Sequence, residues 1–339
     1  MIYLAGVPGG GWSIRERELN KLWNYRLWSY YYSVQEKNIM PQIKNKVDLF
    51  LDSGAFSAKS QGVKINIQEY ISFIKENETY IDVYANLDVI GNPKATFNNQ
   101  KRMERAGLHP LPVFHFGEDE ELYLKPLIEK YDYIAIGGMV KSGDLMSFLD
   151  RIFSKYICDK KGMPKVKIHG FGLTSLKLIM RYPWYSVDST SWVVTGRMGS
   201  IYIPRRKNGK WIYNENSWKI PVSNKSPSLK EAGQHFTTMR NSERQLIIDY
   251  LKEKGYKIGE SKFKDKNQDY ELQENEKWFE KKPQNKSDKR KVEIIVVPGV
   301  SNKYQLRDEI NIIYFLDLEK SLPEWPWVYK SKVMKGFGL

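Results

Sequence analysis

Cysteine is almost absent from this chain: Cys158 is the single one among 339 residues. An intrachain disulfide and a multi-cysteine zinc site both need more than one thiol, so both are excluded. Long apolar runs are missing too, since no segment approaches the roughly 18 apolar residues of a membrane span. These absences predict a protein of the cytoplasm with no membrane partner and no metal. No cofactor is expected either.

Acidic residues are fewer than basic ones. Lys and Arg number 54 against 40 Asp and Glu, which gives a net charge of +14 and a pI near 9.4. Because neutralisation of phosphates dominates nucleic-acid affinity, this excess predicts a polyanionic partner, although solubility alone explains it equally well. Aromatic residues lie close to basic ones from Lys21 to Trp28, a pattern that suits either base stacking or a packed helix.

Short β-rich runs bounded by glycine or proline occur seven times in the first 192 residues. An eighth strand has only a weak candidate, from Trp218 to Val222. The seven runs are Ile2 to Gly6, Val47 to Gly54, Tyr80 to Val89, Leu111 to Gly117, Tyr133 to Gly138, Val166 to Gly172 and Tyr185 to Trp192.

Helical patterns separate most of these runs. Asn66 and Thr174 are candidate caps of two helices, and a third helical pattern runs from Leu145 to Tyr156. Strands that alternate with helices predict an α/β fold with a parallel sheet. Seven or more such units favour a (β/α)8 TIM barrel over an open doubly wound sheet, with a basic insertion and a small C-terminal α/β appendage.

The basic insertion lies near 196–220, where six Lys or Arg residues accompany one acid. Alternating apolar residues flank an Asn-Gly turn from Ser200 to Tyr213, which predicts a hairpin with a basic tip. A hairpin of this kind can lie on a phosphate backbone, or its tip can simply be solvated. The candidate nucleic-acid contacts are Arg197, Arg205, Arg206, Lys207 and Lys210.

Three segments are expected: a barrel domain over 1–258, a linker or mobile loop over 259–290, and the appendage over 291–339. The linker is predicted because Glu260 to Arg290 is rich in Lys, Asn, Gln and Glu. Before it, a helix capped by Asn241 or Ser242 should stop before Gly255. In the appendage, residues 293–297 and 312–316 are predicted strands.

Three aspartates lie inside or at the ends of apolar runs: Asp52, Asp88 and Asp188. A carboxylate is costly to bury and is rarely needed for folding, whereas a barrel enzyme places its catalytic groups at strand ends. Paired carboxylates support displacement at a carbon that bears a leaving group, one as nucleophile and another as proton donor or acceptor. The aspartates therefore predict an active site at the barrel rim.

These motifs resemble the tRNA-guanine transglycosylase superfamily. Residues 52–56 (Asp-Ser-Gly-Ala-Phe) are similar to its Asp-Ser-Gly-Gly-aromatic motif, and residues 134–139 to its Gly-Gly-Leu segment. Residues 169–172 and Asp188 are similar to its Gly-Val-Gly segment and nucleophile strand. The resemblance covers under half of the chain, from Asp52 to Asp188. It implies a (β/α)8 barrel that exchanges guanine in a polynucleotide for a 7-deazaguanine such as preQ0.

The resemblance also implies roles for individual residues. Asp188 would attack the ribosyl C1′ and hold a covalent intermediate, and Asp52 would be the general acid and base. Asp88 would bind the Watson–Crick edge of guanine. Either His115 or Phe116 falls where the family has a base-reading glutamine. The remaining base contacts would be the backbone of Gly137, Gly138 and Met139 and the rings of Phe56 and His169, which sandwich the purine.

The tRNA enzymes carry a zinc held by three cysteines and a histidine beyond the nucleophile, and this chain has no cysteine after Cys158. The resemblance is therefore closest to the zinc-free deazapurine DNA-modifying transglycosylases of bacteria and phages. It implies DNA and a free 7-deazaguanine base as partners, with tRNA as the alternative polynucleotide.

A guanine stacked in a duplex must be flipped out, and Trp12, Trp184 and Trp192 are candidates to offset that cost. Three other functions remain open. The chain could be a zinc-free tRNA base exchanger, a hydrolase acting at a sugar C1′ through Asp188 and Asp52, or a non-catalytic nucleic-acid-binding protein on a degenerate barrel.

Overall fold

The computed structural model describes residues 1–6, 23–33, 47–139, 144–226, 232–281 and 285–330. The chain forms two compact units. The first comprises Met1–Gly6, Asn20–Thr190 and Leu318–Leu339, and the second comprises Val7–Leu19 and Ser191–Asp317. The boundaries predicted at 258/259 and 290/291 both fall inside the second unit, so the segment 291–339 is divided between the two units.

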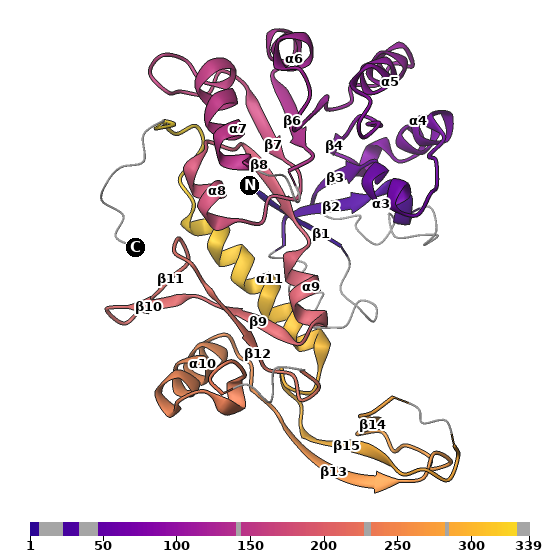
Figure 1. The fold of residues 1–339 in the computed structure, drawn as a ribbon, viewed down its shortest axis with the longest axis vertical. Coiled ribbons are helices and arrows are strands. Elements are labelled where there is room, and N and C mark those ends of the chain that lie inside the picture. The colour runs from indigo at the N-terminus through magenta and orange to yellow at the C-terminus, as the bar shows by residue number, and fades with distance from the viewer. Residues whose placement is uncertain (7–22, 34–46, 140–143, 227–231, 282–284, 331–339) are drawn as a thin grey trace. The chain divides into compact units, whose positions relative to one another are not determined.

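Eight strands of the first unit form one parallel sheet, in the order β4-β3-β2-β1-β8-β7-β6-β5 (Figure 1). The outer strands β4 and β5 meet at a parallel bridge between Ala85 and Leu111, where the Leu111 N–H donates to the Tyr84 carbonyl at 2.8 Å. The sheet therefore curls as in a TIM-like fold, and the predicted α/β class is confirmed. The strands are β1 (Ile2–Ala5), β2 (Tyr25–Ser29), β3 (Asp48–Asp52), β4 (Val83–Tyr84), β5 (Val113–His115), β6 (Tyr133–Gly137), β7 (Lys167–Gly170) and β8 (Ser186–Ser189).

The eighth strand, β2, lies in the basic and aromatic stretch that predicted base stacking or a packed helix. It pairs with β1 and β3, and its central Arg26 is buried with the guanidinium 4.5 Å from the centroid of the Trp23 ring. A buried cation interrupts the apolar run by which a central parallel strand is usually recognised. The candidate at Trp218 to Val222 was wrong, because that segment lies in an antiparallel pair of the second unit.

The predicted helices are present, with one shifted cap. Asn66 caps α4 (Ile67–Glu76) by accepting from the Gln68 N–H at 2.9 Å, and α7 (Leu145–Ile152) continues as the π-helix η4 (Phe153–Ile157). Ser175, not Thr174, precedes α8 (Leu176–Arg181). Helices α4, α5, α6 and α7 lie around the outside of the sheet in Figure 1. The other helices are α2 (Tyr30–Ser33), α3 (Ala55–Ser60), η2 (Glu78–Tyr80), α5 (Pro93–Arg105), η3 (Glu120–Leu124) and α6 (Lys125–Lys130).

Strand alternation decides which side chains point into the barrel. Leu49 and Leu51 of β3 pack outward in a cluster that includes Tyr70 of α4, whereas Phe50 packs in the cluster that holds Tyr3. Because alternate residues share a face, Asp52 points the same way as Phe50. The same alternation places the last inward residues of β5, β6 and β8 at the carboxyl end of the sheet, where a barrel carries its site.

The second unit contains the predicted hairpin in a shorter form. Strands β10 (Arg205–Lys207) and β11 (Lys210–Ile212) pair across Asn208 and Gly209, whose φ angles of 49° and 77° fit the predicted Asn-Gly turn. The hairpin stops at residue 205, because β9 (Ser200–Ile203) pairs instead with β12 (Trp218–Pro221). Both strand pairs contribute to a core that includes Ile201, Ile220, Ile247 and Tyr250.

The rest of the second unit differs from expectation at three places. The stretch predicted as a linker holds two strands, β13 (Glu260–Lys266) and β14 (Glu276–Trp278), which flank β15 (Arg290–Val297). The segment 312–316 is helical, within α11 (Tyr304–Ser321), because an apolar run does not by itself distinguish a buried helix from a strand. Helix α10 (Asn241–Glu253) begins after Arg240, one residue before the predicted caps, and ends before Gly255 as expected. Helices α9 (Ser191–Arg197) and η6 (Phe236–Thr238) complete the unit.

Candidate active site

The polar side chains at the carboxyl end of the first unit's sheet form one cluster. Asp52 ends β3, Asp88 follows β4, His115 ends β5, and Asp188 lies on β8. Burial, and after it the charges of Asp88 and Asp188, raise the pKa of Asp52 to about 8, against the opposing backbone N–H donors of Gly54 and Ser53. The three predicted acids therefore lie close enough to interact electrostatically.

Asp188 is buried and is held through one of its two oxygens. The Gly172 N–H donates to Oδ1 at 2.8 Å, and His169 Nε2 lies 3.3 Å from the same atom. Among the described residues, Oδ2 accepts no hydrogen bond. A carboxylate that is oriented at one oxygen and free at the other is arranged to attack an electrophile.

A chain of two hydroxyl groups determines which ring nitrogen of His169 carries the proton. Its Nδ1 lies 2.7 Å from Ser186 Oγ, which is itself 2.6 Å from the Tyr133 hydroxyl. Burial lowers the pKa of His169, although Asp188 opposes the effect, so the imidazole is neutral. Since a carboxylate only accepts, the single ring proton belongs on Nε2, and Nδ1 accepts from Ser186. His169 thus orients Asp188.

This geometry changes the expected role of His169. The ring was predicted to flank the purine, but it is fully buried, and its centroid lies 4.5 Å from that of Phe50 and 4.7 Å from that of Phe171. Both ring nitrogens are occupied, so no face or edge is left for a base. His169 belongs to the aromatic layer beneath the acids.

Asp88 is bound at both oxygens. Ser53 Oγ donates to Oδ1 at 2.9 Å, and His115 Nε2 lies 2.9 Å from Oδ2. The other ring nitrogen of His115 lies 3.2 Å from Glu118 Oε1, and the His115 backbone N–H donates to Glu118 Oε2 at 3.0 Å. Each carboxylate oxygen has two lone-pair sites, so Asp88 keeps one acceptor site on each oxygen for a ligand.

His115 is a cation in this arrangement. Only an imidazolium can donate from both ring nitrogens at once, and both nitrogens face a carboxylate. Burial lowers the pKa of His115, but the hydrogen bonds to Asp88 and Glu118 outweigh it and raise the pKa to about 9. The ring is therefore committed to the two acids, whereas the alternative residue Phe116 packs against Phe148 with a centroid distance of 4.7 Å.

Asp52 carries a proton at neutral pH, as its raised pKa requires. The Gly54 N–H donates to its Oδ2 at 3.1 Å, and Gly54 has a φ of 76°. A Cβ at residue 54 would collide with Ser29 Oγ of β2, so glycine is needed for this turn. The Asp-Ser-Gly sequence therefore presents Asp52 and Ser53 immediately before a tight turn at the left-handed Gly54.

The glycine segment after β6 lies beside His115. A Cβ on Gly137 would lie 2.9 Å from His115 Cδ2, and the Gly137 carbonyl accepts from the Phe116 N–H at 3.0 Å. Gly138 is exposed with a φ of 72°, while Met139 is buried. Phe56, the other predicted base contact, is 68% exposed on α3 and is free to stack on a ligand.

Four residues of this cluster were not predicted from the sequence to have a role in the site. Ser53, Glu118, Gly172 and Ser186 each bind one of the predicted acids or histidines. Two of them had a usable signal, because Glu118 is three residues from His115, and Ser186 is two residues before Asp188 on the same strand face. The contacts of Ser53 and Gly172 depend on turns that no periodic pattern encodes.

The predicted tryptophan platforms do not line the acids. Trp184 and Trp192 are buried, at 3% and 0% exposure, and Trp184 precedes β8 at the opposite end of that strand from Asp188. Trp12 lies outside the described residues.

The basic residues predicted to bind phosphate all lie in the second unit, and most have local partners. Arg205 donates to the Asn216 carbonyl at 2.8 Å, Arg206 lies 3.4 Å from Asp249, and Lys207 lies 2.6 Å from Glu215. Lys210 has no acidic partner among the described residues, and Arg197 ends α9. Part of the hairpin's charge is therefore compensated within the unit.

Two absences among the described residues concern metal binding and membrane crossing. They contain no cluster of three or more His, Cys, Asp or Glu side chains placed to hold a metal ion. In the same part of the chain, no helix combines the length and apolar character needed to cross a membrane.

Comparison with known proteins gave no relative: no family model matches the chain, and no curated protein or solved structure matches it either. Any function assigned to this chain therefore depends on the geometry of its own residues.

Proposed function

We propose that this chain is a DNA-guanine transglycosylase, a pentosyltransferase that exchanges guanine in DNA for a 7-deazaguanine. The observation that carries the proposal is the pairing of two unlike carboxyl groups. Asp52 has a pKa of about 8 and so keeps a proton, while Asp188 Oδ2 has no hydrogen-bond donor among the described residues. A protonated carboxyl can act as the acid, and a carboxyl that is oriented at one oxygen and open at the other can act as the nucleophile.

The first half of the reaction uses this pair directly. Asp188 Oδ2 attacks the ribosyl C1′, the C1′–N9 bond breaks, and its electron pair leaves with guanine. Asp52 gives its proton to the departing base, which leaves neutral, and is itself left as a carboxylate. The nucleotide is then held as an ester of Asp188.

The second half reverses these steps with a different base. N9 of the incoming 7-deazaguanine attacks C1′ as its N9–H proton passes to Asp52, and the ester bond to Asp188 breaks. Both acids return to their starting protonation. Asp88, fixed by Ser53 and His115, supplies acceptor sites for the N1–H and N2–H donors of the guanine edge.

Two features favour DNA as the polynucleotide. The chain lacks the cysteines with which tRNA enzymes of the resembled family hold zinc, and its net charge of +14 attracts phosphate irrespective of base sequence. tRNA remains the alternative polynucleotide. A non-catalytic binding protein is disfavoured, because a barrel without chemistry gains nothing from holding Asp52 at a raised pKa beside two other acids.

The test is incorporation of radiolabelled guanine into DNA and into tRNA by the purified protein. We expect label in DNA, faster at unpaired or mismatched guanine because less flipping energy is needed, and slower when inosine removes the N2 amino group. Denaturing electrophoresis should reveal a protein–DNA adduct.

The Asp188→Asn protein should form no adduct and lose about a thousandfold or more in rate. Asp269→Asn, at an exposed aspartate of the second unit, is the matched control and should behave as wild type. Label in tRNA alone would refute the DNA assignment, and an active Asp188→Asn protein would refute the transglycosylase itself.

A further inference from the structure

A pocket lies at the opposite end of the first unit's strands from Asp52, Asp88 and Asp188. Its volume is about 220 Å³, and it is lined where β1 and β8 begin and by the segment after α11. This volume is below the roughly 300–1,000 Å³ of sites for drug-sized ligands, so it suits a small group. Nothing in the proposed transglycosylase reaction uses this pocket.

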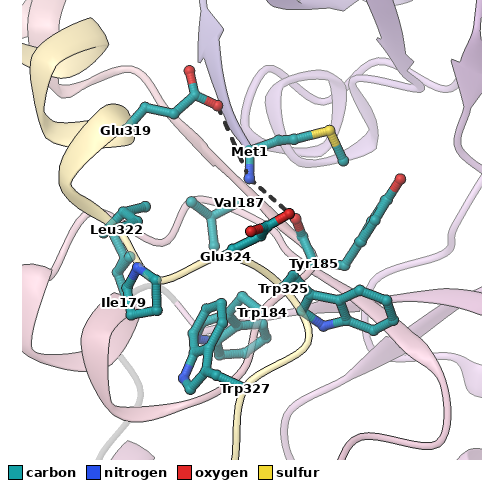
Figure 2. A pocket seen from close by; sticks show the side chains of 11 residues that line it. Met1, Ile179, Trp184, Tyr185, Val187, Glu319, Leu322, Glu324, Trp325 and Trp327 are labelled. Atoms are coloured by element: carbon teal, nitrogen blue, oxygen red, sulfur yellow. Dashed lines mark hydrogen bonds and ion pairs between the residues drawn. The ribbon is translucent and has the colours of Figure 1, made fainter.

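Three indole rings dominate the lining: Trp184, Trp325 and Trp327. Figure 2 shows them gathered on one side of the pocket, with the Glu324 carboxylate between them and Met1. The Trp184 indole N–H donates to the Leu178 carbonyl at 3.0 Å, and the Trp325 N–H donates to the Pro183 carbonyl at 3.1 Å. Trp184 is only 3% exposed and packs against Phe153 with a centroid distance of 5.0 Å, so it forms a buried wall of the pocket. Trp325 and Trp327 are half-buried, and the surface that they offer a ligand is the electron-rich π-face.

The net charge of the lining is negative. Two glutamates, Glu319 and Glu324, border the pocket, and the one cation beside them is the Met1 ammonium, which lies 4.0 Å from Glu319; no Lys, Arg or His is among the described lining residues. Such a patch is unusual in a chain with 54 basic and 40 acidic residues. Glu319 is already engaged, since it accepts from the Ile2 N–H at 2.9 Å, whereas Glu324 is exposed and has no ion-pair partner among the described residues. Glu324 is therefore the carboxylate left for a ligand.

We propose that this pocket binds a small organic cation, an alkylated ammonium group, through the faces of Trp325 and Trp327 and the charge of Glu324, with Trp184 as its buried wall. Aromatic rings attract cations through their quadrupole, tryptophan most strongly, and cages of such rings recognise quaternary ammonium groups. A neutral apolar ligand would be held by the rings but would gain nothing from Glu324. The ammonium can belong to a free amine or to a methylated lysine side chain.

The test compares choline with its neutral carbon isostere, in which a tert-butyl group replaces the trimethylammonium group. Binding is followed by the indole N–H signals in NMR spectra of the whole chain, assigned by single Trp→Phe replacements. We expect choline to bind at least about tenfold more tightly than the isostere and to shift the Trp325 and Trp327 signals. A trimethyllysine peptide and free trimethyllysine then distinguish the two sources of the cation.

Two variants separate the cage from general effects on folding. Trp327→Ala should weaken choline binding by about tenfold, while Trp218→Ala, a half-buried tryptophan of the second unit, should leave it unchanged. Glu324→Gln, at an exposed position, should weaken choline binding and leave binding of the isostere unaltered. Equal affinity for choline and the isostere, or choline binding that neither pocket variant weakens, would overturn the proposal.

Discussion

His115 Nε2 lies 2.9 Å from Asp88 Oδ2, and the opposite ring nitrogen lies 3.2 Å from Glu118. One imidazolium thus donates to two carboxyl groups in a buried row. The arrangement holds Asp88 in place, which is what a site needs if it is to accept two N–H donors from a base edge. It also ties the stability of the first unit to the protonation of His115.

Replacing His115 by Gln should flatten the pH dependence of stability. Because the folded pKa is raised from 6.5 to about 9, His115 stabilises the fold fully below pH 6.5, and this stability is lost as pH rises through about 9. The side chain is almost fully buried, so the effect is about 3 kcal/mol at most. Urea unfolding below pH 6.5 and above pH 9 should show a larger loss for His115→Gln at the lower pH.

The same variant separates positioning from fold maintenance. Gln can donate to Asp88 but not to Glu118 at the same time, so guanine should bind less tightly while the chemical step at Asp188 is preserved. We expect KM for the polynucleotide to rise with little change in kcat. A parallel fall in kcat would instead mean that His115 acts on the reacting atoms.

Asp52 should set an alkaline limit on exchange. Its raised pKa of about 8 means that the proton needed by the departing guanine is lost above that pH, so the rate should fall there. The pH profile of kcat measures this limit directly. A rate that stays constant well above pH 8 would remove Asp52 from the role of general acid.

Asp52→Asn should be inactive yet more stable. A carboxyl group whose pKa rises from 3.8 to about 8 on folding stabilises the fold only below pH 3.8, and this contribution is lost as pH rises through about 8. An amide does not ionise, so its burial carries no cost of this kind. Above pH 8 the free energy of unfolding of the variant should therefore exceed that of wild type by about 2 kcal/mol, after allowance for the solvent that reaches this half-buried group. Thermal or urea unfolding across this pH range measures the difference, which should vanish in acid.

The sequence predicts most of the curled parallel sheet, because seven of its eight strands are apolar runs bounded by glycine or proline. It misses β2, where Arg26 occupies the centre of the strand and is balanced by the Trp23 ring rather than by a solvent-facing position. The polar composition of 259–290 also predicts a linker or mobile loop, which is wrong. There, β13 and β14 gain their order by pairing with β15, and cross-strand pairing leaves little trace in composition.

The residues of the candidate site likewise divide into those that the sequence predicts and those that it does not. The positions of Asp52, Asp88 and Asp188 could be predicted because the carboxyl ends of parallel strands meet at one edge of the sheet. The contacts of Ser53 with Asp88 and of Gly172 with Asp188 could not, because both residues lie in turns. His169 illustrates the consequence: its place on β7 is predicted, but its burial against Phe50 and its bond to Ser186 give it a different task.

Ser186→Ala tests the chain of hydroxyl groups behind Asp188. Without the Ser186 hydroxyl, Nδ1 of His169 can take the ring proton, and an unprotonated Nε2 then faces Asp188 as a second acceptor. We expect kcat to fall by about tenfold with KM unchanged, because Ser186 orients the reactive group Asp188 through His169 and does not contact the substrate. Tyr133→Phe is the control one step further away and should cost less, since it leaves the Ser186–His169 bond in place. Equal losses in both variants would point to disturbed packing instead.

The hairpin of the second unit can be tested by salt dependence. Lys210 has no acidic partner among the described residues, whereas Lys207 lies 2.6 Å from Glu215, and both are exposed lysines flanking the same turn. If the hairpin contacts DNA, Lys210→Gln should reduce the slope of log affinity against log salt by about 0.9, the value for one lost phosphate contact on a duplex. Lys207→Gln is the matched control and should change the slope less, because Glu215 competes with phosphate for its charge. Fluorescence anisotropy with labelled duplex DNA over a series of salt concentrations gives both slopes. Identical slopes for wild type and Lys210→Gln would mean that Lys210 does not contact the phosphate backbone, and the charge of the hairpin would then be assigned to solubility.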